Sequence, residues 1–218
     1  MIYKKIKCLL VLLLAFQLVV PAPLLAAAVG QFTSVMGDVT VSRAGVRIKP
    51  AVKMPVHTKD LIVTGDRSTV TLLLEDDSTI SLSSNSRFEV REFNVRGKTR
   101  RGLFSMTIGR LTAEVKKFIG GNSSFEVHSP TAVAGVRGTG FEFVVAMVGP
   151  QLTTTVTCTA GAMSVSAISA TGAVVATSTI VAGQTAVISA GGITVSAATV
   201  GAAGAGAADV CGDFIVSG

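Results

Sequence analysis

The stretch Val136–Phe143 reads VRGTGFEF and indicates the fold of the whole chain. Its two glycines can adopt backbone conformations that are closed to most other residues, so they predict a turn. Its two phenylalanines then alternate with a polar glutamate, which is the period-two pattern of a half-buried strand. The stretch therefore predicts a turn that leads into a β-strand.

Arg137 lies at the beginning of this strand and is the only lysine or arginine after Lys117. An isolated arginine beside an apolar strand commonly donates hydrogen bonds to backbone carbonyls or to a carboxylate. In that structural role, its replacement by alanine would cost about 2 kcal/mol through stranded buried acceptors. The alternative is a guanidinium that faces a ligand. The sequence leaves both roles open.

Short apolar alternations, separated by turn residues, extend over residues 35–145. The segments 66–72 and 76–82 repeat one pattern at an offset of ten residues, which indicates a hairpin or two stacked rungs of a small β-solenoid. Residues 111–119 fit both helical and strand spacing, and the surrounding β-pattern favours a strand. We therefore expect an all-β chain of short strands, solenoid-like or sandwich-like, with little or no helix outside the leader described below.

The second half of the chain is uncharged. No Asp, Glu, Lys or Arg occurs in residues 143–208, which are mostly Ala, Val, Thr, Ser and Gly. Glycines separate four expected strands, at residues 153–157, 163–165, 174–177 and 185–188. No charge guards the edges of these strands, so this half favours self-association. Residues 199–218 form a Gly/Ala-rich tail, which we expect to be a linker.

The first 28 residues have the pattern of a secretory signal peptide. Three lysines form a basic start, an apolar core follows, and Ala26–Ala28 is a small-residue cleavage site. The alternative, an uncleaved membrane anchor, is disfavoured because Pro21 and Pro23 interrupt a span that is barely long enough. We therefore expect an exported protein, periplasmic or secreted, with a β-domain over residues 29–198 and no integral membrane segment after cleavage.

Charge and cysteine content limit the partners. The formal net charge is +6, and removal of the three leader lysines lowers it to +3. A nucleic-acid partner therefore has no support from composition. After cleavage, Cys158 and Cys211 remain in an oxidising compartment, where one disulfide is possible. The sequence does not show whether these two cysteines pair.

We find no pattern that indicates catalysis. His57 and His128 are the only histidines, and no Gly-x-Ser-x-Gly elbow or zinc-type cluster occurs. The acidic triplet Glu75–Asp77 fits a charged turn better than a calcium site. The basic run Arg96–Arg101 fits a solvated turn, with contact to acidic envelope polymers or lipid headgroups as the alternative. We expect no enzyme and no catalytic, metal-binding or cofactor-binding residues.

One stretch resembles a known family. Residues 129–141 read SPTAVAGVRGTGF and resemble the signature of the FecR-type domain, named after the envelope regulator of iron-dicitrate uptake. Residues 65–82 are similar to a second family segment, although Asp77 is followed directly by Ser78 where the family usually has an intervening glycine. The resemblance covers residues 34–146. It assigns four motif positions that we expect to be mainly structural: Arg137, Gly138, Thr139 and Phe141.

The resemblance implies an envelope protein that acts by protein contact. In the family's regulators the β-domain lies in the periplasm, after a cytoplasmic anti-sigma segment and one membrane helix, and receives a signal from an outer-membrane receptor. Here a leader occupies the place of that segment. We expect a motif-bearing core at residues 34–146 and an uncharged extension at residues 147–198. The expected role is non-catalytic binding of an envelope or outer-membrane protein, related to signalling. The alternative is a structural, self-assembling envelope or surface protein.

Overall fold

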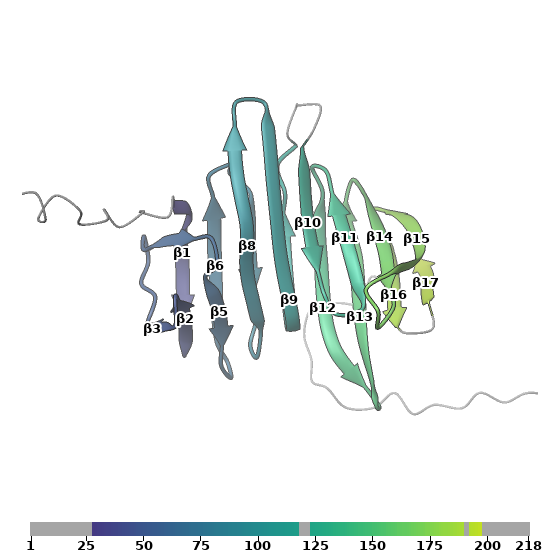
Figure 1. Ribbon diagram of the computed structural model, residues 1–218, viewed down its shortest axis with the longest axis horizontal. Coiled ribbons are helices and arrows are strands. Elements are labelled where there is room, and N and C mark those ends of the chain that lie inside the picture. Colours follow the sequence, from purple (N-terminus) through teal and green to yellow (C-terminus); the bar gives the residue numbers. More distant parts are fainter. Residues whose placement is uncertain (1–27, 118–122, 190–191, 198–218) are drawn as a thin grey trace, which may run out of the picture.

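A computed structural model describes residues 28–117, 123–189 and 192–197 of the chain (Figure 1). All regular structure in these residues is β-strand, so the expectation of an all-β fold is confirmed. None of the described residues forms a helix that could cross a membrane. The strands are β1 (Ala28–Met36), β2 (Val39–Arg43), β3 (Val46–Ile48), β4 (Pro55–His57), β5 (Leu61–Thr64), β6 (Thr69–Leu74), β7 (Thr79–Leu82), β8 (Arg87–Arg96), β9 (Thr99–Glu114), β10 (Ser124–His128), β11 (Ala132–Val136), β12 (Gly140–Val148), β13 (Gln151–Ala160), β14 (Ala162–Ile168), β15 (Val174–Val181), β16 (Gln184–Ser189) and β17 (Gly192–Ala197).

The strands form two layers that enclose the core, in a sandwich-like arrangement. The first layer has the order β4-β1-β6-β7-β9-β12-β13-β16-β17. The second layer has the order β3-β2-β5-β8-β9-β10-β11-β14-β15. Both layers are open at their ends. Strand β9 belongs to both layers and lies near the middle of the molecule (Figure 1).

Strand β9 changes layers at Gly109. Up to Ile108 it pairs with β8 in the second layer, and from Gly109 onward it pairs with β12 in the first. Gly109 has a φ of 110°, and a Cβ at this position would lie 2.3 Å from the Ser86 Oγ. Only glycine fits this crossing without strain, because other residues rarely adopt such a φ and have no room for a side chain. The segment at residues 111–119, ambiguous in sequence, is a strand as far as Glu114.

Successive hairpins build the two layers. The offset repeat of the sequence is the β6–β7 hairpin, in which Val70 lies opposite Leu82 and Leu72 opposite Ile80. Later hairpins alternate between the layers: β12–β13 and β16–β17 lie in the first, β10–β11 and β14–β15 in the second. β14 pairs with β11 and β16 with β13, so the uncharged strands continue both layers.

The core consists of the inward residues of alternating strands, as the period-two pattern predicts. Four aromatic rings form its centre: Phe104 packs against Phe88, Phe93 and Phe125, with ring centroids 5.6, 6.0 and 4.8 Å apart. The alternation after Gly140 is confirmed as well, because both phenylalanines of that stretch are fully buried.

One part of the interior was not predicted. Arg100, from the expected solvated basic run, is buried against Asp76, from the expected charged turn. Their side chains are 1% and 0% exposed, and Arg100 Nη1 lies 2.5 Å from Asp76 Oδ2. The same nitrogen donates to the Lys116 carbonyl at 3.0 Å, and the guanidinium lies 5.2 Å from the centroid of the Phe125 ring. For Arg100 the expectation of a solvated turn was wrong, whereas Asp76 lies in the expected turn between two strands, with its side chain buried.

The leader and the tail lie outside the described residues, apart from Ala28 at the beginning of β1. Cys211 also lies outside, so its pairing with Cys158 stays a prediction. Cys158 itself is buried, and its Sγ is 3.6 Å from the carbonyl oxygens of Ala160 and Gly161. Burial raises the pKa of its thiol above the ordinary value.

Candidate protein-interaction site

Three of the four motif residues hold the turn before β12 in place. Gly138 has a φ of 66°, and a Cβ there would lie 2.8 Å from the Lys117 Cα. Thr139 is 2% exposed, and its hydroxyl donates to the Ala162 carbonyl at 2.9 Å. Phe141 is fully buried. Their contacts fit the structural role that we expected for the motif.

Arg137 differs from the rest of its motif. Its side chain is exposed, and no hydrogen bond or ion pair of its guanidinium occurs within the described residues. The guanidinium is therefore accessible to a ligand, as the second of its two possible roles requires. Two exposed lysines, Lys116 and Lys117, lie on the segment that packs against the motif turn. A hollow of about 270 Å³ opens between that segment and the turn.

Both histidines contact carboxylates that are close to them in sequence. His128 Nε2 lies 2.9 Å from the Glu126 Oε2 on the same strand. No hydrogen bond joins either histidine to a serine hydroxyl among the described residues. Nor do these residues contain a group of three or more His, Cys, Asp or Glu side chains that could hold a metal ion.

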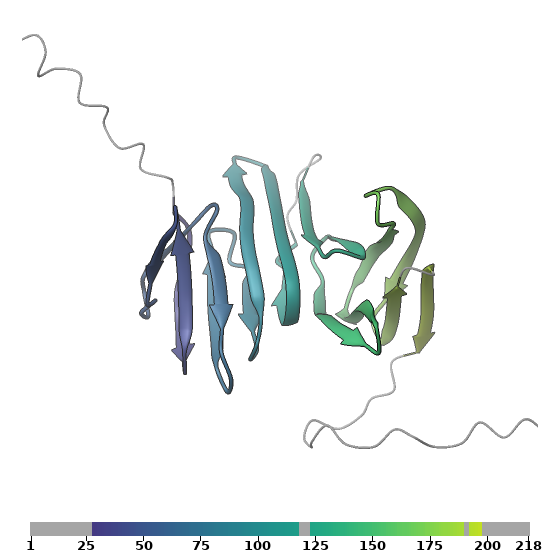
Figure 2. The same cartoon turned by 60° about the horizontal axis from the view of Figure 1, so that its bottom comes forward.

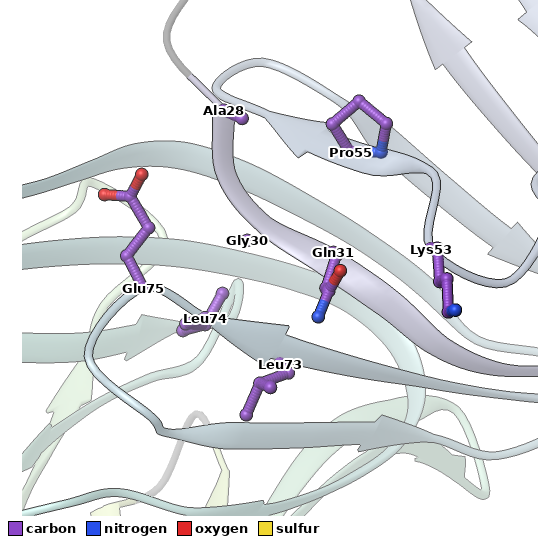
Figure 3. Close-up of a pocket in the computed structure, with 8 residues that line it drawn as sticks. All are labelled: Ala28, Gly30, Gln31, Lys53, Pro55, Leu73, Leu74 and Glu75. Carbon is purple, nitrogen blue, oxygen red and sulfur yellow. The ribbon is translucent and has the colours of Figure 1, made fainter.

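Another surface hollow lies near the N-terminal end of the described chain. It has a volume of about 350 Å³ and lies between β1, β4 and β6, with Lys53 and Glu75 on opposite sides of it (Figure 3). No histidine, cysteine, serine or threonine lines it, and Lys53 and Glu75 are its charged residues. Its lining residues are Ala28, Gly30, Gln31, Lys53, Pro55, Leu73, Leu74 and Glu75.

The two ends of the sandwich differ in length and charge. At the N-terminal end the outer strands, β3 and β4, have three residues each, and basic residues lie in or beside them: Arg47, Lys49 and Lys53. At the other end the outer strands, β15 and β17, have eight and six residues and no charge. Figure 2 shows these yellow-green strands together at the end opposite β1. Natural sheets usually guard an edge by shortening or charging it. Only the N-terminal end follows this rule.

The backbone of β15 has one free side. The N–H of Val181 donates to the Gln184 Oε1 at 3.0 Å and not to β14. The N–H of the next residue, Ala182, donates to the Gly161 carbonyl at 3.0 Å, on the side of β14. Backbone groups of alternate residues face alternate sides of a strand. The N–H and C=O groups of Thr177 and Thr179 therefore face away from β14, where no described strand pairs with them.

Apolar side chains surround this free side. Val174, Val175 and Val181 are 62%, 56% and 47% exposed. On strands β16 and β17 of the first layer, Val187 and Val195 are 39% and 38% exposed. We call the unpaired side of β15, together with Val174, Val175 and Val181, the β15 edge. The sequence indicated that the uncharged half would have unguarded edges, and the structure shows which strand provides one.

Known proteins resemble this chain both in sequence and in fold. Residues 60–164 match the sequence model of the family described as FecR protein. Two crystal structures of a candidate anti-sigma factor from Parabacteroides distasonis ATCC 8503 are similar in fold, with 14% and 15% identity and TM-scores of 0.50 and 0.51. Each comparison covers 63% of this chain and 59% of the other, so the chain spans about three fifths of the length of those structures. None of the curated proteins matches the sequence. Residues 60–164 of this chain are therefore a FecR-type domain.

Proposed function

We propose that this chain is an exported, non-catalytic module of the bacterial envelope that binds a protein partner in a signalling pathway. The FecR-type domain supports this role, since in the family's regulators the domain receives a signal from an outer-membrane receptor in the periplasm. The similarity in fold to a candidate anti-sigma factor agrees with it. An envelope or outer-membrane protein is the partner class that follows.

The observation that carries the proposal is the β15 edge. An unpaired strand offers a row of backbone donors and acceptors to an extended segment of another protein. The N–H and C=O groups of Thr177 and Thr179 supply that row, and the exposed valines beside them supply apolar contact. Because no charge lies on β15, pairing with a partner strand would desolvate no ion of β15 itself.

Export is the part of the proposal that concerns the N-terminus. The predicted leader ends at Ala28, which is the first residue of β1, so cleavage there leaves nearly the whole strand in the mature chain. Expression in a Gram-negative host, followed by fractionation and intact mass measurement, tests this point. We expect a mature protein in the periplasm that begins near Val29. Full-length chain confined to the cytoplasm would refute export.

Partner binding is tested by crosslinking in whole cells with three forms of the tagged chain. The edge variant Thr177→Lys/Thr179→Lys places two charges on the free side of β15. The control variant Thr69→Lys/Thr112→Lys adds the same charges at exposed threonines of β6 and β9, which are paired on both sides. We expect the control to capture the same envelope protein as the wild type and the edge variant to capture at least about tenfold less. Equal capture by both variants would refute the role of β15.

A further inference from the structure

The exposed face of β15 is a palindrome. Its outward residues are Val175, Thr177, Thr179 and Val181, which read Val-Thr-Thr-Val symmetrically about Ser178. We infer that β15 pairs antiparallel with β15 of a second copy of this chain, across a two-fold axis at Ser178. This inference rests on the proposed function, because it names an occupant of the same edge.

Backbone geometry fits this pairing. With the axis at Ser178, Thr177 of one copy lies opposite Thr179 of the other, and the reverse pair forms on the far side of the axis. The backbone groups of both threonines face the free side of β15. Each Thr177–Thr179 pair can therefore exchange both N–H···O=C bonds of a hydrogen-bonded antiparallel pair.

Side chains fit the same register. On the outer face threonine meets threonine, and Val175 meets Val181 of the second copy. On the inner face Ala176 meets Ile180, so a small side chain lies opposite a large one. Threonine pairs that lie opposite each other on neighbouring strands can hydrogen-bond and so stabilise a sheet. An axis at Thr177 or Thr179 would pair one of these valines with threonine and leave the other without a partner on β15.

The ends of β15 limit the pairing to its centre. A β-bulge interrupts the register with β14 between Ala176 and Val174, and the Gln184 side chain occupies the N–H of Val181. The hydrogen-bonded segment is therefore Ala176–Ile180, Val175 and Val181 meet only through their side chains, and the contact between copies is short. A short contact favours a reversible dimer, in which the second copy and another partner compete for the edge.

Symmetry is what distinguishes a second copy from an unrelated partner. A two-fold interface is isologous, so the same patch must complement itself. A palindromic outer face meets this condition, whereas an unrelated strand would not require it. The outer strand at the other end of the second layer is β3. It has only three residues and lies among basic residues, which disfavours the same contact there.

Charge pairs at positions 177 and 179 test the register. In Thr177→Lys/Thr179→Glu, lysine of one copy would lie opposite glutamate of the other at both pairs. In Thr177→Lys/Thr179→Lys, like charges would lie opposite each other, which destabilises cross-strand pairs. Sedimentation at low salt over a range of concentrations should give a dimer for the Lys/Glu variant at least about tenfold more stable than for the Lys/Lys variant. The same mass for both variants at every concentration would overturn the inference.

A cysteine at the axis provides a second test that does not change charge. Ser178 would face Ser178 of the second copy in a non-hydrogen-bonded pair, with Cα atoms about 4.5 Å apart. That spacing is within the range of a disulfide. We expect Ser178→Cys to form a disulfide-linked dimer under mild oxidation. The control Ser164→Cys, an exposed serine of β14, should stay monomeric. Cys211 is replaced by serine in both. No crosslink at position 178, or equal crosslinking at 164, would overturn the inference.

The outcomes separate this inference from the proposed function. If Ser178→Cys does not crosslink while the Lys/Lys variant still loses its envelope partner, the second copy is not the occupant and the proposed function stands. If Ser178→Cys crosslinks but the Lys/Lys variant captures the envelope partner normally, the inference stands and the β15 edge is not the site of that partner.

Discussion

The buried pair of Arg100 and Asp76 allows a prediction whose magnitude follows from the structure. Asp76→Asn keeps the shape of the side chain but removes its charge, while the Arg100 guanidinium stays buried. The carboxylate accepts hydrogen bonds from Arg100 at 2.5 Å and from the Ser78 hydroxyl at 2.8 Å. Removal of one partner of a buried ion pair typically costs 3–5 kcal/mol. We therefore expect Asp76→Asn to lower the free energy of unfolding by about 3–5 kcal/mol.

Asp77→Asn is the matched control for this prediction. Asp77 is exposed and has a φ of 61°, which asparagine tolerates well, so we expect a change within about 0.5 kcal/mol. Urea denaturation of the mature protein measures both variants. The double variant Asp76→Asn/Arg100→Met should cost less than the sum of its single changes, because the two side chains are coupled. Equal stability of Asp76→Asn and Asp77→Asn would refute the reasoning.

Three further predictions concern single positions. Gly109→Ala should lower the free energy of unfolding by about 2 kcal/mol or more, because its Cβ would meet the Ser86 backbone at the crossing of β9. The control Gly97→Ala has open space around it and should lower the free energy of unfolding by only about 1 kcal/mol. Denaturation curves of the two variants measure this difference. Arg137→Ala should change stability by less than about 0.5 kcal/mol, since the side chain is exposed; a loss near 2 kcal/mol would restore its structural role. The thiol of Cys158 should resist alkylation in the folded protein. Because the pKa of this thiol is raised in the folded state, stability should fall as the pH rises above about 8.5, the pKa of an unfolded cysteine. Rapid alkylation at neutral pH, or stability independent of alkaline pH, would count against this prediction.

Local patterns were sufficient to predict much of the fold. Apolar alternation and the offset repeat at residues 66–82 predicted the strands and the β6–β7 hairpin, because both depend on residues close in sequence. The motif positions Gly138 and Phe141 were expected to be structural for the same reason. A glycine within a strand pattern is a known sign of a bend, so Gly109 carried a signal for the crossing of β9 that could have been used.

Features that depend on topology could not be predicted. Arg100 and Asp76 are separated by 24 residues, and their meeting requires the arrangement of β7, β9 and the turn after β6. Without that arrangement, each residue belongs to a charged segment that is normally solvated. Likewise, the sequence showed that residues 143–208 lack charge, but only the strand order makes β15 an outer strand with one free side.

The central claim is that the β15 edge is where another protein chain binds, and site-specific photocrosslinking in living cells tests it most directly. A photoreactive amino acid is placed at Thr179 in one variant and at Thr112, exposed but on a strand paired on both sides, in the other. We predict that Thr179 gives discrete adducts, with masses that identify a second copy of the chain or an envelope protein, and that Thr112 gives none. Adducts of equal yield from both positions, or none from Thr179, would contradict the claim.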